Sequence, residues 1–73
     1  MSNVESFKIE LEQEDDGRWI GEIAALSGVI AYVSTREYAL VAVQALALRV
    51  LADRLDHGEV APDELMNVSF VGA

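Results

Sequence analysis

A long apolar segment, residues 34–55, is the feature that most limits how this chain can fold. Ser34 and Glu37 have the spacing of a capping box, with Thr35 as the alternative cap, so the free N–H groups of a first helical turn have acceptors. His57-Gly58 supplies the stop, because a residue that can be cationic is followed by one that tolerates left-handed backbone. The segment therefore predicts one long helix.

The apolar residues of this helix fall on two faces when they are placed at about 100° per residue. The first face has the spacing of a helix that packs on a sheet and contains Ala39, Leu40, Val43, Leu46, Ala47, Val50 and Leu51. The second face would point to solvent in a two-layer domain and contains Val41, Ala45, Leu48, Ala52 and Leu55. Single exposed apolar residues are ordinary, so this face can be plain surface. Five in register favour an oligomer interface or a partner contact.

The length of 73 residues predicts a single domain, 1–73, that buries only about 60% of its unfolded surface, so oligomerisation would help its stability. The composition is 52% hydrophobic, which argues against disorder, but Gln44, Arg49 and Asp53 interrupt the apolar runs well short of a membrane span. Cysteine is absent, and the polar start Met1–Ser6 does not have the pattern of a secretory signal. These features fit a cytoplasmic location.

Thirteen acidic residues against five basic ones give a formal net charge of −8. Non-specific nucleic-acid binding depends on clustered Lys and Arg, so no direct binding of nucleic acid is expected. A basic partner protein is the natural complement of this charge. Plain solubility of a small apolar domain explains the acidity equally well.

Alternating apolar and polar residues predict three antiparallel strands before the helix, at Ser6–Glu12, Trp19–Ala24 and Val29–Val33. Asp16-Gly17 lies between the first two strands and predicts a hairpin, because glycine accepts positive φ. Leu26-Ser27-Gly28 predicts the second turn. The chain should therefore form a three-stranded antiparallel meander.

The sequence after the helix predicts a short connector and one more strand. Glu59–Leu65 contains Pro62, which suits the first position of a single helical turn. Met66–Val71 alternates again and is typical of a strand. The predicted fold is therefore α+β, in the order β-β-β-α-β.

Three pieces of the sequence form an ordered series: Asp16-Gly17-Arg18-Trp19-Ile20-Gly21-Glu22-Ile23, Leu26-Ser27-Gly28-Val29 and Ser34-Thr35-Arg36-Glu37-Tyr38-Ala39. In this order they resemble the HicB-type antitoxin family of type II toxin–antitoxin systems. The resemblance covers about Phe7 to Leu51 and is carried by the ordered series, since each piece alone is a generic hairpin or cap. Ser27 stands where the family's turn proline is usual, Val33-Ser34 replaces Gly-Asp, and Tyr38 replaces a second glutamate.

This resemblance implies a partial RNase H-like, HicB-like fold in its short single-domain form. It also implies that the protein binds a small basic ribonuclease toxin of the HicA type and blocks its RNA site. Many members carry a further DNA-binding module after this domain, and operator binding by this chain alone is not expected.

Two groups of residues could in principle support metal-dependent chemistry. Glu10, Glu12 and Glu22 point outward on adjacent predicted strands, where carboxylates can serve two-metal hydrolysis, but a solvated sheet face explains them equally. Asp53 and His57, spaced i and i+4, offer too few ligands for a metal, so an ordinary helix C-terminus is preferred. No enzyme activity, metal or cofactor is predicted.

Trp19 and Tyr32 are the aromatics that could stack nucleic-acid bases, although cross-strand packing is the more ordinary role. We predict a non-catalytic, self-associating antitoxin-like protein whose carboxylates meet the basic partner, namely Glu10, Glu12, Glu14, Asp15, Asp16 and Glu22. The alternatives are an orphan regulatory or structural module that only self-associates, and a nuclease-related or RNA-binding protein.

Overall fold

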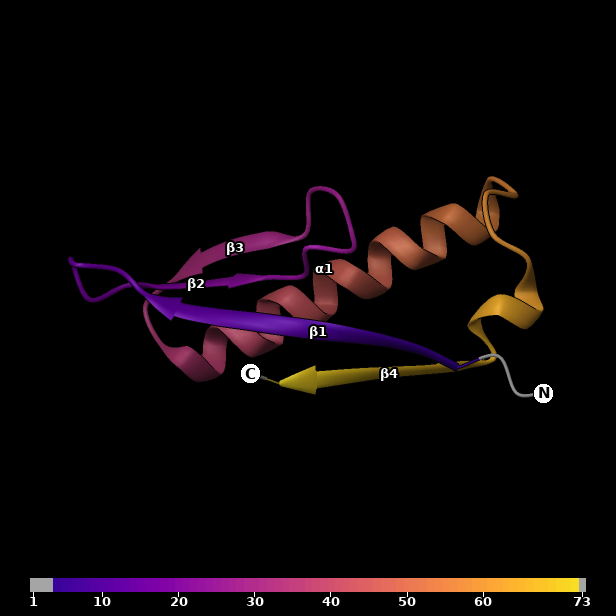
Figure 1. Ribbon diagram of the computed structural model, residues 1–73. Coiled ribbons are helices and arrows are strands. Elements are labelled where there is room, and N and C mark those ends of the chain that lie inside the picture. The colour runs from indigo at the N-terminus through magenta and orange to yellow at the C-terminus, as the bar shows by residue number, and fades with distance from the viewer. Residues whose placement is uncertain (1–3, 73) are drawn as a thin grey trace.

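The computed structural model describes residues 4–72 and consists of a four-stranded sheet and one long helix (Figure 1). The elements are β1 (Val4–Gln13), β2 (Trp19–Glu22), β3 (Ile30–Val33), α1 (Arg36–Asp56), a 3-10 turn η1 (Pro62–Leu65) and β4 (Asn67–Gly72). The strand order in the sheet is β3-β2-β1-β4. The meander β1-β2-β3 is antiparallel, and β4 lies parallel to β1. The α+β class is therefore confirmed, with a mixed sheet, while the RNase H-like assignment stays a prediction.

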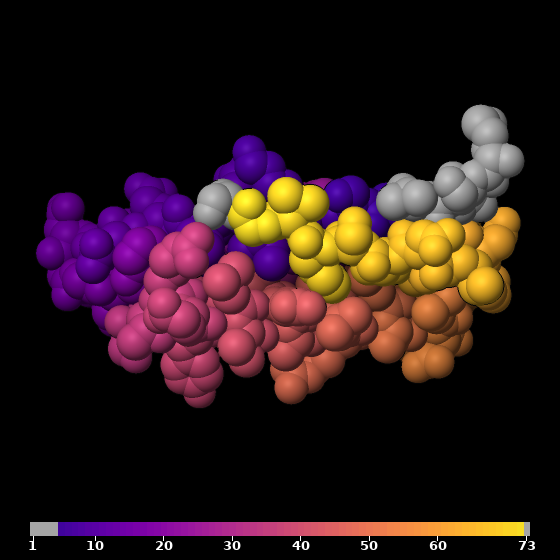
Figure 2. Space-filling view, turned by 90° about the horizontal axis from the view of Figure 1, so that it is seen from below, coloured from indigo at the N-terminus to yellow at the C-terminus, as the bar shows by residue number. Residues whose placement is uncertain are grey.

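The two layers form a thin slab, whose Cα extents are 42 × 25 × 15 Å. Figure 2 shows the slab edge-on, with α1 along one side of the strands. A helix with its side chains is about 10–12 Å across, so this thickness holds the sheet and a single helical layer. Within residues 4–72, no helix or strand covers the other side of the sheet.

The strands have the expected inward and outward residues but are shorter than predicted in the middle of the meander. Ile23 and Val29 were predicted within strands and instead lie in the turn that joins β2 to β3, linked by a hydrogen bond from Ile23 N–H to Val29 O (3.0 Å). Leu26 is buried at the tip of this turn. Ile23, Leu26 and Val29 thus belong to the core, while the four residues between them are exposed.

The core lies between α1 and the inner face of the sheet. The first apolar face predicted for the helix packs there, since Ala39, Val43, Ala47 and Leu51 are buried. The remaining buried hydrophobic side chains come from β1 and from the turn after β2, and they are Phe7, Ile9, Ile23, Leu26 and Val29. Half-buried Leu40, Leu46 and Val50 pack around this cluster, so the predicted core stripe is confirmed.

The helix begins one residue later than the preferred capping box requires. Thr35 is the N-cap, with extended backbone (φ −133°, ψ 158°), and its side-chain oxygen accepts a hydrogen bond from Tyr38 N–H at 3.1 Å. The Ser34 cap was therefore wrong and the Thr35 alternative right: β3 ends at Val33, and the chain stays extended through Thr35 before the helix begins at Arg36. Glu37 lies in the first turn, where its negative charge interacts favourably with the positive end of the helix dipole.

The end of the helix follows the prediction. His57 is the C-cap and donates its backbone N–H to Asp53 O at 3.0 Å, and Gly58 has φ 69°. The connector then forms η1 with Pro62 at its start, and Glu64 accepts a hydrogen bond from Ala61 N–H at 3.1 Å.

The last strand, β4, returns along the outer edge of β1. Phe70 lies beside Phe7 in the register, with ring centroids 6.0 Å apart, so this parallel pair closes one end of the core. Local sequence predicts the strand itself but carries no information about its neighbour.

Gly21 of β2 is the point where the helix comes closest to the sheet. A Cβ atom at this position would lie 2.6 Å from Val43 Cγ2 and 3.2 Å from the backbone oxygen of Ala39. Real Cβ atoms do not approach other atoms so closely, so glycine is needed here for packing. In the part of the chain that the structure describes, no helix is both long and apolar enough to cross a membrane.

Candidate functional site

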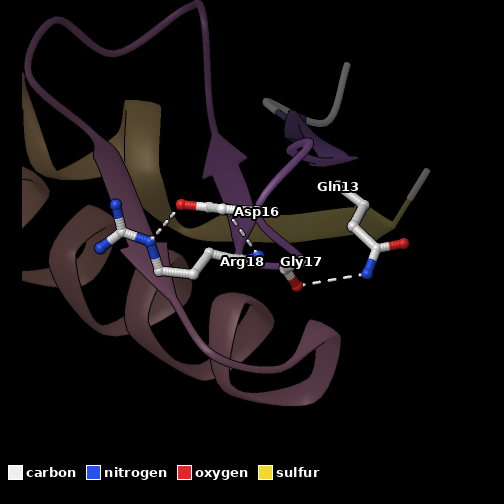
Figure 3. A network of polar contacts seen from close by, with 4 residues as sticks. All are labelled: Gln13, Asp16, Gly17 and Arg18. Atoms are coloured by element: carbon white, nitrogen blue, oxygen red, sulfur yellow. Dashed lines mark hydrogen bonds and ion pairs between the residues drawn. The ribbon is translucent and has the colours of Figure 1, made fainter.

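The hairpin between β1 and β2 carries the densest group of carboxylates. Gly17 has φ 89°, which lets the chain reverse, and Glu14 N–H donates to Arg18 O at 2.7 Å. The side chain of Gln13 donates to Gly17 O at 3.2 Å (Figure 3). The Asp-Gly hairpin predicted from the sequence is therefore confirmed, and it holds an exposed, ordered loop at one end of the slab.

Asp16 is tied to Arg18 inside this hairpin. Its carboxylate accepts the Arg18 backbone N–H at 3.0 Å and the guanidinium Nε at 3.1 Å (Figure 3). The backbone N–H, and then the guanidinium, hold the pKa of the Asp16 carboxyl below its ordinary value. Asp16 thus already has a cation beside it, and its charge is less available to a partner than its exposure suggests.

A shallow, open hollow lies over the hairpin and is lined by Glu12, Gln13, Glu14, Asp15 and Asp16. Glu12 also belongs to the outer face of the sheet, where Glu10 lies directly opposite Glu22 in the β1–β2 register. The six residues predicted to bind a partner therefore form one surface that runs from the sheet onto the hairpin. Like charges directly opposite one another on a sheet are unfavourable, so this surface repels itself.

The second predicted face of α1 lies on the side away from the sheet. Val41, Leu48 and Leu55 are 62%, 51% and 39% exposed. Ala52 is exposed as well, and Ala45 is half-buried. Tyr38, also exposed, precedes Ala45 by one heptad and extends this face, although the sequence analysis left it out.

The two aromatics weighed as a stacking platform lie on opposite sides of the sheet. Tyr32 pairs with Ile20, whereas Trp19 pairs with Val33, one residue out of phase. The cross-strand packing of Trp19 against Tyr32 that the sequence suggested is therefore wrong, and the two rings form no common platform. Tyr32 is exposed on the outer face, beside Ile20 and Ile30.

A third potential ligand, the carboxylate of Glu59, joins the pair Asp53 and His57 just after the end of α1. Asp53, His57 and Glu59 place potential ligand atoms within 4.8 Å of one another, all on exposed side chains. However, His57 Nδ1 lies 2.8 Å from the backbone oxygen of Asp53 and 3.2 Å from its carboxylate. These contacts satisfy the end of the helix, which is the role that the sequence favoured.

No family model, curated protein or solved structure matches this chain. The resemblance to HicB-type antitoxins thus rests on the short motifs in the sequence alone.

Proposed function

We propose that this protein is an antitoxin-like binding protein that neutralises a small basic ribonuclease and associates with itself through the outer face of α1. The observation that carries the proposal is the acidic surface on β1, β2 and their hairpin. Opposed carboxylates on a rigid sheet attract a cationic protein and speed its association, with an affinity that falls as salt rises.

The partner is tested by co-purification with the tagged protein at low and high salt, followed by the mass and sequence of every protein that elutes. We expect one small basic protein, released by salt, whose RNA cleavage stops when the two are mixed. Recovery of the tagged chain alone at both salt concentrations would contradict partner binding and favour an orphan module that only self-associates.

Two double variants that remove the same charge test which surface contacts the partner. Glu10→Gln with Glu12→Gln, and Asp56→Asn with Glu59→Gln, each remove the same charge from exposed positions, but only the first pair lies on the outer face of the sheet. We expect the first pair to weaken binding strongly and the second pair to change it little. Equal losses would mean that net charge alone attracts the partner.

Self-association is tested separately with Leu48→Glu. Leu48 and Val71 are 51% and 52% exposed, so a glutamate at either position leaves the monomer's core intact. We expect Leu48→Glu to give a monomer of 7.9 kDa in light scattering, whereas Val71→Glu stays assembled. If Leu48→Glu keeps the wild-type mass, the outer face of α1 is not the interface.

A further inference from the structure

The outer side of the sheet has an ordered arrangement of side chains that alternation along one strand does not reveal. Phe7 and Ile9 of β1 are buried under α1, so the even-numbered residues of β1 point away from the helix. The register then places the outward residues in two rows across the three antiparallel strands, namely Glu12–Ile20–Tyr32 and Glu10–Glu22–Ile30.

These rows divide the face into an acidic part and an apolar part. The carboxylates lie on β1 and at Glu22 of β2, and the apolar group, which we call the outer apolar trio, consists of Ile20, Ile30 and Tyr32. Ile30 is 42% exposed and Tyr32 is 56% exposed. Both side chains are large, so covering them with a partner would contribute strongly to binding. Within residues 4–72, no element of the chain covers them.

We propose that the outer apolar trio is the hydrophobic centre of the partner-binding surface, and that its occupant is a cationic amphipathic segment of the partner protein. Apolar side chains of that segment cover the trio, and its Lys or Arg side chains reach the adjacent carboxylates of Glu10, Glu12 and Glu22. This inference rests on the proposed function and adds the apolar contact, which salt does not screen, to the electrostatic one.

Charge complementarity selects this occupant over the alternatives. A second copy on the same face would bring the same carboxylates together around a two-fold axis and add to the repulsion that already exists between Glu10 and Glu22. The phosphates of a nucleic acid would meet the same repulsion. A cationic side chain placed between Glu10 and Glu22 relieves their repulsion. An apolar side chain next to it on the partner segment would then contact Ile20 or Ile30.

The test uses a synthetic amphipathic peptide of Lys and Leu, about 14 residues and roughly 20 Å long as a helix. A second peptide has the same composition in an order that leaves no apolar face. Each is titrated into the isotopically labelled full chain at low salt, and backbone amide shifts are followed by NMR. We expect saturable shifts in β2 and β3 with the first peptide and much weaker binding of the second.

Variants then separate the apolar contact from the charge. Tyr32→Ser is expected to lower the affinity for the amphipathic peptide by at least about tenfold, as for an aromatic at the centre of an interface. Val71→Thr is the matched control, because Val71 has similar exposure on the same side of the sheet but lies opposite Lys8 rather than the glutamates. It should change affinity by less than about twofold. Ile30→Thr, which retains strand propensity, provides a second reading if Tyr32→Ser lowers stability.

Three results would overturn the inference. They are equal binding of the two peptides, shifts confined to the outer face of α1, and an affinity that Tyr32→Ser and Ile30→Thr leave unchanged in chains whose NMR spectra remain folded. The proposed function fails on a different result, namely co-purification that recovers the tagged chain alone at both salt concentrations. If binding of the co-purified basic partner is weakened by Glu10→Gln with Glu12→Gln but not by Tyr32→Ser, the antitoxin-like role stands and the apolar centre is wrong.

Discussion

Replacing Gly21 by alanine tests how closely α1 packs on the sheet. The added Cβ would lie 2.6 Å from Val43 Cγ2, whereas carbon atoms in contact sit about 3.5–4.0 Å apart. Val43 is fully buried, and the backbone oxygen of Ala39, at 3.2 Å, blocks movement in another direction. The helix or the strand must therefore shift by about 1 Å to make room.

Overpacking of this kind costs about 1–3 kcal/mol. Alanine in a strand also regains about 0.5–1 kcal/mol relative to glycine, because it has less backbone freedom to lose on folding. The net expectation is a loss of about 1–2 kcal/mol. For a domain of this size that lowers Tm by roughly 5–15 °C, which urea and thermal denaturation followed by circular dichroism resolve easily.

Gly72→Ala is the matched control, because Gly72 also lies in a strand but a Cβ there would meet nothing within 4 Å. It should be neutral or slightly stabilising. In the Gly21→Ala background, Val43→Ala should cost less than it does alone, because it removes the clashing methyl group. A Gly21→Ala variant as stable as the wild type would refute the close contact between β2 and α1.

Three further predictions concern local interactions. Thr35→Ala should lower the free energy of unfolding by about 1 kcal/mol through loss of the Tyr38 N–H acceptor, whereas Ser34→Ala should be nearly neutral in the same denaturant titration. Glu22→Gln should stabilise the fold by about 0.2–1 kcal/mol by removing repulsion from Glu10, and the gain should shrink at high salt. Because the pKa of Asp16 is lower in the folded chain than its ordinary 3.8, its carboxylate supports the hairpin at neutral pH and loses this effect as pH falls below about 3.8 through the folded pKa. An NMR titration should show a depressed Asp16 midpoint that Arg18→Ala restores only in part, because the largest contribution comes from the backbone N–H of residue 18.

Features that depend on residues close together in the sequence were predictable from the sequence. The Asp16-Gly17 hairpin follows from the backbone freedom of one residue, and the buried stripe of α1 follows from helical periodicity. The helix start was less certain, because Ser34 and Thr35 are both good N-caps. Only the backbone path out of β3 decides between them, and that path depends on the sheet.

Features that depend on register were not predictable from one strand at a time. Gly21 has no room for a Cβ because β2 passes directly under Val43, and the alternation along β2 does not specify this contact. Trp19 and Tyr32 lie on opposite faces because the β2–β3 pairing puts Tyr32 beside Ile20. A shift of one residue in that pairing would have moved Tyr32 to the other face, so its exposure is a property of the assembled sheet.

The charge pattern suits the two open apolar surfaces to the two different roles proposed for them. The middle of the outer face of α1 carries uncharged Val, Ala and Leu side chains, with Tyr38 before them, and its bordering carboxylates, Glu37 and Asp56, lie only near the two ends of the helix. Two copies can therefore meet along its middle without opposing carboxylates there. The outer apolar trio is bordered by Glu10, Glu12 and Glu22, so the same two copies would repel one another across it. The proposed self-association and the proposed partner binding therefore use no common residue. A variant that makes the protein monomeric should still bind the amphipathic peptide, and one that loses the peptide should still assemble.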